Sequence, residues 1–279
     1  MTQTDTFDRS CAHWSEAGRA EMERFYEIAT VDYLHLAEAR DWAVWLAAHQ
    51  KAVGDRPLRL LDVACGSGKF PVALQNHGGI AAAAVPDIDY ALLDPSEFSI
   101  REAKAALAPP FQPGAEYQTT VQDLDAPANS FDIAWATHAL YAVPPTALKA
   151  GLARLLDVVS GEVFIAHAYA DAHYLSFQRL FLEAFDRTDE TPYTPAEAVI
   201  DELKALGAEV EVNDIAYENG AALDQRDAVE GYLQRCVFDE TVSLETMEAA
   251  PVLTAYLEAC RANGAWRFAQ RVALITAKP

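Results

Sequence analysis

A short loop that follows an apolar run carries the strongest chemical signal in the sequence. The run from Leu58 to Val63 includes one acidic residue, Asp62, and the small-residue loop after it contains Gly66 and Gly68 before a helical pattern begins at Lys69. Glycine has no Cβ, so the backbone at these two positions can approach a ligand closely. We therefore predict a ligand-binding loop at the carboxyl end of a strand. The residues expected to contact the ligand here are Asp62, Ala64, Gly66, Ser67 and Gly68.

The acidic residue separates this loop from a dinucleotide-binding one. Dinucleotide folds share the strand–loop–helix order, but they carry G-x-G-x-x-G and aim a helix N-terminus at a pyrophosphate. Here Pro71 occupies the third glycine position. A carboxylate at Asp62 would repel a pyrophosphate, whereas it could pair with a cationic ligand or order the loop amides. The pattern favours a nucleoside with a positively charged tail, a description that fits S-adenosylmethionine.

A second acidic residue ends the next apolar run. Asp94 follows the run 90–93 and precedes Pro95 and Ser96. A carboxylate at the end of the second strand can accept hydrogen bonds from both ribose hydroxyls of a nucleoside. An ordinary helix cap is the alternative interpretation of Asp94.

The order of these segments resembles the class I S-adenosylmethionine-dependent methyltransferases. Residues 60–70 resemble motif I of that family, with Ala64 where the family most often has its first glycine, and residues 122–135 resemble its adenine-edge segment and fourth strand. The resemblance implies that Asp123 accepts a hydrogen bond from the adenine amine, with the Leu124 amide nearby; a solvated loop is the alternative. The cofactor-binding residues implied in addition are Asp94, Pro95, Asp123, Leu124 and Thr137. The implied cofactor is S-adenosyl-L-methionine, and its product is S-adenosyl-L-homocysteine.

The exit of the fourth strand holds the candidate catalytic residue. Residues at the carboxyl end of a central strand line the ligand crevice of such folds, and His138 is the one side chain of this segment that can exchange a proton near neutral pH. A histidine that only positions the substrate is the alternative. The segment contains no N-P-P-Y-like tetrapeptide, which argues against methylation of nucleobase or amide nitrogens.

A more distant resemblance to histamine N-methyltransferases rests on short strings at residues 92–96, 140–143, 232–238 and 268–275. It implies that the substrate contacts Arg24, His138, Tyr141 and Gln270. An arginine at position 24 would repel an ammonium group and attract a carboxylate.

These residues need a sheet to position them. Strand patterns at 58–63, 90–94, 116–120, 131–137, 162–168, 209–217 and 266–277 alternate with helical patterns, which indicates crossover connections and a mainly parallel sheet covered on both faces. The resemblance implies a Rossmann-like, doubly wound α/β fold with seven strands, of which the last two form an antiparallel edge. We predict an N-terminal helical cap at 1–53 and a methyltransferase domain at 54–279. The cap helices at 16–50, with a break at 30–32, and a helical pair inserted at 226–262 are expected to cover the carboxyl ends of the strands.

Composition excludes several classes of partner. The chain has 279 residues, 51% of them hydrophobic, and 21 basic against 42 acidic residues give a net charge of −21. An acidic surface repels nucleic acid and anionic lipid, and the longest apolar stretch, 80–85, is too short to span a bilayer. The cysteines are scattered and no histidine has metal-ligand spacing, so we expect free thiols and no metal. No signal peptide is readable, so we expect a cytoplasmic protein.

The predicted function is transfer of a methyl group from S-adenosylmethionine to a small polar metabolite, at the nitrogen of an amine or amino acid. The alternatives are sulfur or oxygen methylation of a similar metabolite, a relative that binds the cofactor without turnover, and a nicotinamide-dependent oxidoreductase. A thioether acceptor needs no base, whereas an ammonium must lose a proton before it attacks.

Overall fold

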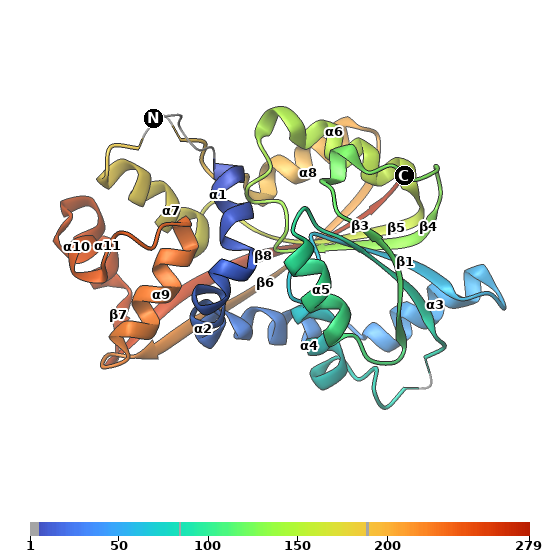
Figure 1. The fold of residues 1–279 in the computed structure, drawn as a ribbon, viewed down its shortest axis with the longest axis horizontal. Helices are drawn as coiled ribbons and strands as arrows, with labels where there is room; N and C mark the ends of the chain where they lie inside the picture. The colour runs from blue at the N-terminus through green and yellow to red at the C-terminus, as the bar shows by residue number, and fades with distance from the viewer. Residues whose placement is uncertain (1–5, 84, 188–189) are drawn as a thin grey trace.

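A single twisted sheet organises the chain in the computed structural model, which describes residues 6–83, 85–187 and 190–279 (Figure 1). The strand order is β3-β2-β1-β4-β5-β8-β6, and the two-residue β7 pairs with β8. The first five strands are parallel, and β8 runs antiparallel to both β5 and β6. The strands are β1 (Leu58–Val63), β2 (Ile88–Leu93), β3 (Phe111–Tyr117), β4 (Phe131–Thr137), β5 (Val159–Ala168), β6 (Glu209–Ala222), β7 (Arg261–Ala262) and β8 (Ala265–Lys278). The predicted doubly wound α/β fold is confirmed.

Helices cover both faces of the sheet. On one face α3 (Trp42–Val53), α4 (Lys69–His77) and α5 (Glu97–Ala106) enclose one apolar core, and on the other α6 (Pro145–Val158) and α8 (Ala196–Ala205) enclose a second. Figure 1 shows the first group below the sheet and the second above it. The strands β1, β4 and β5 are almost wholly buried because both faces are covered.

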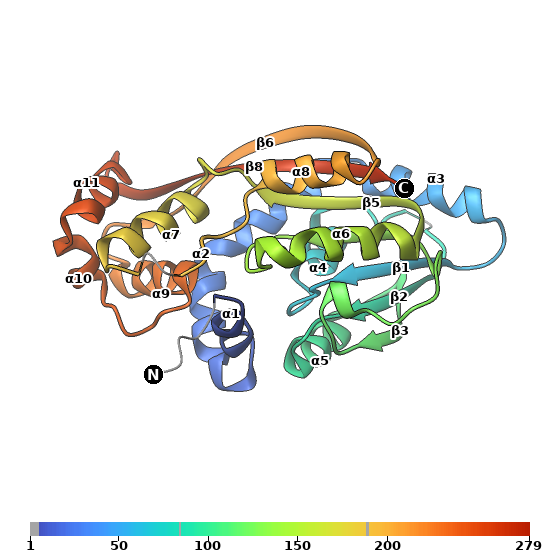
Figure 2. The same cartoon turned by 90° about the horizontal axis from the view of Figure 1, so that it is seen from above.

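A helical lobe extends beyond the carboxyl ends of the parallel strands. Only residues 272–277 of β8 pair with β5, so residues 265–271 continue past the end of β5 together with the matching half of β6. An apolar core of its own joins this extension to the helices of the lobe (Figures 1 and 2). Those helices are α2 (Arg19–Glu38), α7 (His173–Ala184), α9 (Arg226–Val237), α10 (Leu244–Ala249) and α11 (Pro251–Ala259), and α1 (Thr6–His13) lies beside α2.

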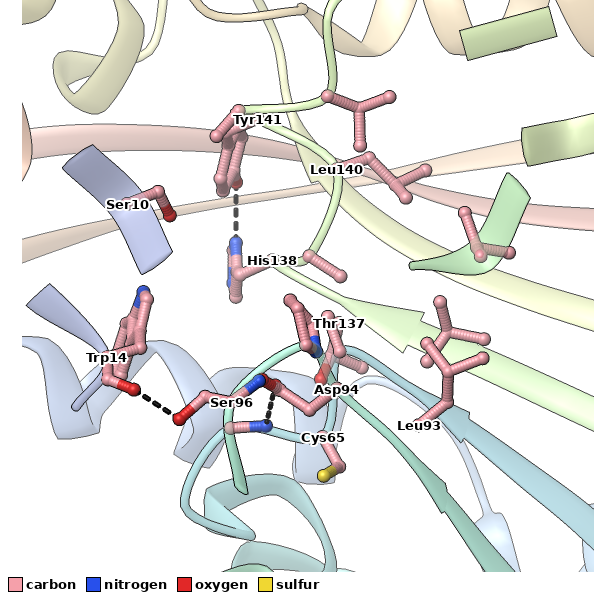
Figure 3. A pocket seen from close by; sticks show the side chains of 18 of the residues that line it. Ser10, Trp14, Cys65, Leu93, Asp94, Ser96, Thr137, His138, Leu140 and Tyr141 are labelled. Atoms are coloured by element: carbon pink, nitrogen blue, oxygen red, sulfur yellow. Dashed lines mark hydrogen bonds between the residues drawn. The ribbon is translucent and has the colours of Figure 1, made fainter. Parts of the chain in front are cut away.

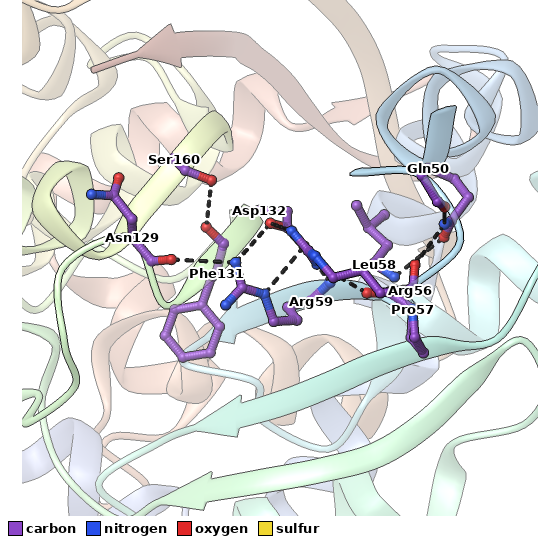
Figure 4. Close-up of polar contacts among 10 residues, drawn as sticks. Gln50, Arg56, Pro57, Leu58, Arg59, Asn129, Phe131, Asp132 and Ser160 are labelled. Atoms are coloured by element: carbon purple, nitrogen blue, oxygen red, sulfur yellow. Dashed lines mark hydrogen bonds and ion pairs between the residues drawn. The ribbon is translucent and has the colours of Figure 1, made fainter. Parts of the chain in front are cut away.

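The amino ends of β1 and β4 are tied together by an ion cluster (Figure 4). The two oxygens of Asp132 accept hydrogen bonds from the Arg56 guanidinium at 2.6 and 2.7 Å, and Arg59 adds its guanidinium at 2.9 Å and its backbone N–H at 2.8 Å. Burial alone would raise the pKa of Asp132, but these donors lower it. The cluster lies at the amino ends of the strands, whereas the predicted ligand loop follows the carboxyl end of β1.

Two expectations about elements are wrong. No break occurs at 30–32: α2 continues to Glu38, and the chain interrupts its helix at 39–41, where the Asp41 carboxylate caps α3 by accepting the Val44 N–H at 3.0 Å. The third strand lies at 111–117 instead of 116–120. Its Pro113 and Gly114 are poor strand formers, and they are tolerated because β3 is an edge strand.

The predicted N-terminal cap consists of two parts that pack differently. The second part, α3, lies on the sheet face, and the Gln50 side chain near its end binds the backbone of Gly54, Arg56 and Leu58 at the amino end of β1. Only α1 and α2 lie toward the carboxyl ends of the strands. The boundary between residues 53 and 54 stays a prediction, and residues 1–5 of the cap are outside the described part of the chain.

The first testable prediction concerns the attachment of α3. Trp42 is fully buried against Phe70, Trp135 and Phe164, and its indole N–H donates to the Leu36 carbonyl at 3.0 Å. Replacing Trp42 with alanine should lower the free energy of unfolding by about 3–5 kcal/mol, as expected for a truncated core aromatic. Urea denaturation measures this. The control is Val44→Ala on the same helix: Val44 is 64% exposed, so that change should stay within about 0.5 kcal/mol.

Candidate active site

The loop between β1 and α4 has a left-handed backbone at three positions. The φ angles are 51° at Ala64, 51° at Gly66 and 71° at Gly68. Glycine adopts this region readily, whereas an alanine is strained there. The departure from the motif at Ala64 therefore falls on a backbone conformation that favours glycine, and the rest of the loop maintains it.

The two glycines of the loop have different structural roles. A Cβ built on Gly66 would meet no atom within 4 Å, because Gly66 lines a cavity. A Cβ on Gly68 would lie 3.0 Å from the Cα of Ala103 and 3.2 Å from the Cβ of Ala106, both on α5. Gly66 thus leaves room for a ligand, while Gly68 permits close packing of α4 on α5. Gly68 does not line the cavity, contrary to its predicted contact with the ligand.

Two carboxylates lie beside this loop. Asp94 fixes it: one oxygen accepts the Gly66 N–H at 3.1 Å and the other accepts the Ser96 N–H at 2.8 Å. Asp62 accepts the Tyr90 hydroxyl at 2.6 Å. Burial raises the pKa of Asp62 to about 7 and that of Asp94 to about 6. Neither forms an ion pair within the described residues, so each is available to a cationic ligand.

The loop and both carboxylates line a cavity of about 1120 Å³ at the carboxyl ends of β1, β2 and β4 (Figure 3). The predicted site residues that line it are Asp62, Ala64, Gly66, Ser67, Asp94, Pro95, Thr137, His138 and Tyr141. Lys69 is a further lining residue. Its ammonium lies 4.5 Å from the centre of the Tyr26 ring and forms no ion pair with the described residues, and burial lowers its pKa.

The N-terminal segment closes this cavity, and sequence reasoning missed it. Phe7, Ser10, Cys11 and Trp14 contribute to the lining. The Ser96 hydroxyl donates to the Trp14 carbonyl, as Figure 3 shows. The guanidinium of Arg235, a residue only 2% exposed, lies 4.2 Å from the Trp14 ring centre. The aromatic residues at 7 and 14 were the available signal, but they are too few to predict a helix.

A second cavity of about 510 Å³ adjoins the first. Its wall is mostly aromatic, and it shares Trp14, Tyr26, Tyr33, His138, Tyr141 and Tyr174 with the first cavity. The residues found only in the second are Phe25, Asp32, Ala168, Tyr217, Tyr232 and Gln270. The shared residues make the two cavities neighbours across a common wall.

His138 lies on that common wall in a strained conformation. Its φ is 54°, and its Nδ1 lies 2.7 Å from the Tyr141 hydroxyl (Figure 3). The same hydroxyl oxygen accepts the Ala168 N–H at 3.1 Å. The hydroxyl proton needs an acceptor, so we assign Nδ1 that role and place the imidazole proton on Nε2. Nε2 has no partner in the described part of the chain.

The electrostatics of His138 contradict its expected titration near neutral pH. Burial, with a smaller effect of the neighbouring His167, lowers its pKa to about 3. The imidazole therefore stays neutral throughout the physiological range, and the assigned tautomer has no lone pair on Nε2. His138 is not prepared to accept a proton.

Besides Gly68, three predicted site residues are outside both cavities. Asp123 is exposed, and its carboxylate accepts a hydrogen bond from the Thr120 hydroxyl at 2.7 Å. Leu124 is buried against α6. The residue before them, Gln122, lines the first cavity instead. Arg24 is half-exposed and pairs with Glu21 at 3.4 Å. Arg24 is therefore withdrawn as a substrate-binding residue. Gln270 lines the second cavity, where its amide donates to the Tyr232 hydroxyl at 3.2 Å.

The comparisons with known proteins agree with this geometry. Residues 60–161 match a family model described as a methyltransferase domain. This part of the chain is a methyltransferase domain. The fold is the one predicted, and the match agrees with the predicted class, that of the class I S-adenosylmethionine-dependent methyltransferases. No curated protein sequence matches the chain.

Solved structures share the fold at low identity. Magnesium protoporphyrin IX methyltransferase from Synechocystis PCC 6803, with bound S-adenosylhomocysteine, is 12% identical with a TM-score of 0.57, covering 99% of this chain and 100% of that one. A Bacillus halodurans C-125 protein with a proposed methyltransferase activity is 14% identical with a TM-score of 0.52, covering 83% and 97%. A Thermotoga maritima methyltransferase with a proposed role as histamine N-methyltransferase is 17% identical and covers 74% and 84%, but its TM-score of 0.45 is too low to inform on the substrate.

Other kinds of site are absent from the part of the chain that the structure describes. There, no three histidine, cysteine, aspartate or glutamate side chains gather in a way that could hold a metal ion. The four cysteines are free thiols. None of the described helices has the length and apolar character needed to cross a membrane.

The second testable prediction separates the two glycines of the methyltransferase loop. In Gly66→Ala the new methyl group should fill space needed by the methyl donor, so affinity for S-adenosylhomocysteine should fall at least about tenfold, with a stability loss of only about 1–2 kcal/mol from the left-handed backbone. Gly68→Ala should lose more stability than Gly66→Ala because α5 must also move. Calorimetric titration and thermal unfolding measure these two effects. A stable Gly68→Ala protein that no longer binds S-adenosylhomocysteine would contradict the packing role.

Proposed function

We propose that this protein transfers a methyl group from S-adenosylmethionine to the nitrogen of a small amine or amino acid. The observation that carries the proposal is the pair of adjoining cavities at the carboxyl ends of the strands. The first combines a glycine loop with two unpaired carboxylates, and the second is lined mainly by aromatic rings. Class I methyltransferases need a donor site and an acceptor site side by side, and these two cavities meet that need.

The residues of the first cavity fit the donor. Gly66 leaves room for the nucleoside, Asp94 can accept the ribose hydroxyls, and Asp62 faces the cationic part of the ligand. Lys69, the unpaired cation of this cavity, is suited to a carboxylate such as that of the methionine portion. Asp62 has no hydrogen bond to the loop amides within the described residues; Asp94 fills that role. This leaves Asp62 for the ligand.

The remaining chemistry is mostly positioning. When bound, S-adenosylmethionine supplies a methyl group on a positively charged sulfur, and transfer to an amine yields the neutral S-adenosylhomocysteine and releases one proton from the ammonium form. His138 and Tyr141 hold the wall between the cavities through their hydrogen bond. The N-terminal segment contributes to the wall of the first cavity and is attached to it by the hydrogen bond between Ser96 and Trp14. We propose His138 as a positioning residue.

The third testable prediction is a pH dependence of cofactor binding. In the free protein the pKa values of Asp62 and Asp94 are raised to about 7 and about 6, so both carboxyls become protonated as the pH falls from 8 to 5.5. The cationic S-adenosylmethionine favours their ionised forms, so the affinity for S-adenosylmethionine should weaken by on the order of 10–100-fold over this range. Calorimetry at several pH values measures the effect. Asp62→Asn should bind more weakly at pH 8 and lose most of the pH dependence.

The fourth testable prediction concerns His138. With its pKa lowered to about 3, the side chain does not change charge between pH 5 and 9. Wild type and His138→Gln should therefore have turnover–pH profiles of the same shape, with a raised KM in the variant because a positioning contact is lost. A wild-type inflection near pH 6.5 that disappears in His138→Gln would restore His138 as a base.

The function itself is tested with a labelled methyl donor. Pooled amines, amino acids, phenols and thiols are each incubated with the protein and S-adenosylmethionine, and methylated products are identified. Nitrogen methylation supports the proposal, whereas sulfur or oxygen products redirect it to those acceptors. Binding of S-adenosylhomocysteine without any turnover would indicate a non-catalytic relative, and binding of NADH alone would overturn the proposal.

A further inference from the structure

The second cavity contains one carboxylate, that of Asp32 on α2. The Asn219 side-chain amide, from β6, donates to its Oδ1 at 2.9 Å. The Tyr217 hydroxyl is buried near the carboxylate without a well-aligned hydrogen bond. Asp32 is thus held in place from β6 by one hydrogen bond while it still borders open space.

No cation of the protein balances this carboxylate. Asp32 forms no ion pair with any described residue, and the residues lining the second cavity include neither lysine nor arginine. His138 is neutral, and Lys69 is in the first cavity only. Burial raises the pKa of Asp32 to about 6, so the group is still largely ionised at neutral pH. A half-buried anion without a partner cation is costly, and a ligand that brings a positive charge reduces that cost.

The rest of the wall has the complementary character. Aromatic rings surround the cavity, among them Phe25, Tyr26, Tyr33, Tyr141, Tyr217 and Tyr232. Phe25 and Tyr232 stack in parallel at 5.6 Å, which presents a continuous apolar wall. The faces of such rings attract a cation, and recognition of ammonium groups commonly combines several rings with one carboxylate. A ligand carboxylate would find no cation here and would be repelled by Asp32.

We propose that the second cavity selects a small amine that carries one positive charge and no acid group, and that Asp32 is the residue that determines this specificity. This inference rests on the proposed function and narrows it, since it excludes amino acids as acceptors. It also replaces the earlier expectation from Arg24, which favoured a carboxylate. Asp32 acts by holding the ammonium, with the rings enclosing the rest of the molecule.

The test uses matched ligands on the intact protein saturated with S-adenosylhomocysteine. Each set holds an amine, the corresponding alcohol and the corresponding amino acid: phenethylamine, phenethyl alcohol and phenylalanine form one set, and tryptamine, tryptophol and tryptophan another, with butylamine, butanol and norvaline as an aliphatic set. Calorimetry gives each affinity, so the measurement does not depend on turnover. In at least one set the wild type should bind the amine at least tenfold more tightly than the alcohol and the amino acid.

The variant is Asp32→Asn, which keeps the shape and removes the charge. It should bind the preferred amine about 100-fold more weakly, as expected for a buried charge that loses its partner, while its preference over the alcohol disappears. Glu27→Gln is the control, because Glu27 is exposed on the same helix and its replacement should change neither affinity. Affinity for S-adenosylhomocysteine should be equal in all three proteins, which verifies that each is folded.

The outcomes separate the inference from the function beneath it. If no amine in any set binds better than its alcohol and amino acid, or if Asp32→Asn keeps the discrimination, the inference is wrong while methyl transfer to other acceptors can still stand. If Asp32→Asn does not fold, the wild-type comparison still decides. If the wild type does not bind S-adenosylhomocysteine, the proposed function itself fails.

Discussion

Three carboxylates without a partner cation among the described residues, two of them buried and one half-buried, are the constraint around which the site is built. Asp62 and Asp94 border the first cavity and Asp32 the second, and the pKa of each is raised by burial. Such groups are expensive in a low-dielectric interior. In the proposed function the ligands carry the missing positive charges, a sulfonium and an ammonium in the donor and, by our inference, an ammonium in the acceptor. The free energy that these unpaired charges cost the folded protein is recovered when a cationic ligand binds.

At the amino ends of the same strands, a buried carboxylate is paired with cations of the protein itself. Asp132 lies at the start of β4 and is neutralised by Arg56 and Arg59, whose hydrogen bonds lower its pKa despite its burial. Parallel strands bring one set of ends to each edge of the sheet. Pairing at the amino ends therefore contributes to stability, and unpaired charge at the carboxyl ends is reserved for ligands. The length of β4 separates the ion cluster from the ligand cavity: the strand begins at Phe131, next to Asp132, and ends at Thr137, which lines the first cavity.

The sequence predicts site residues that lie in one short segment and misses several that come together only when distant segments pack in the lobe. The motif from Asp62 to Gly68, Asp94 and the mainly parallel sheet could be predicted, because each depends on neighbouring residues or on the alternation of strands and helices along the chain. The second cavity could be predicted only in part: the resemblance implied Gln270, but Asp32 and Asn219 were missed because α2 and β6 meet there only in the folded protein. Other site residues were misplaced because residues close together on one helix or turn point in different directions. Arg24 and Asp32 are eight residues apart on α2, roughly 80° apart around the helix axis, so one faces Glu21 at the surface and the other faces the cavity. Asp123 and Gln122 are likewise adjacent in a 3₁₀ turn and point in different directions.

The unpaired carboxylates also set how stability and binding respond to pH. A carboxyl whose folded pKa is raised favours the folded state most when it is protonated, so the contribution of Asp62, Asp94 and Asp32 is complete below the unfolded value near 4 and is lost as the pH rises through 6 to 7. Asp132, with its lowered pKa, contributes above that unfolded value and loses its contribution only in acid. At neutral pH the free methyltransferase domain therefore relies on the ion cluster at one edge while the ionised carboxylates at the other edge oppose folding. In our proposal a cationic donor and a cationic acceptor remove that opposition together, because each supplies the charge that its own cavity lacks.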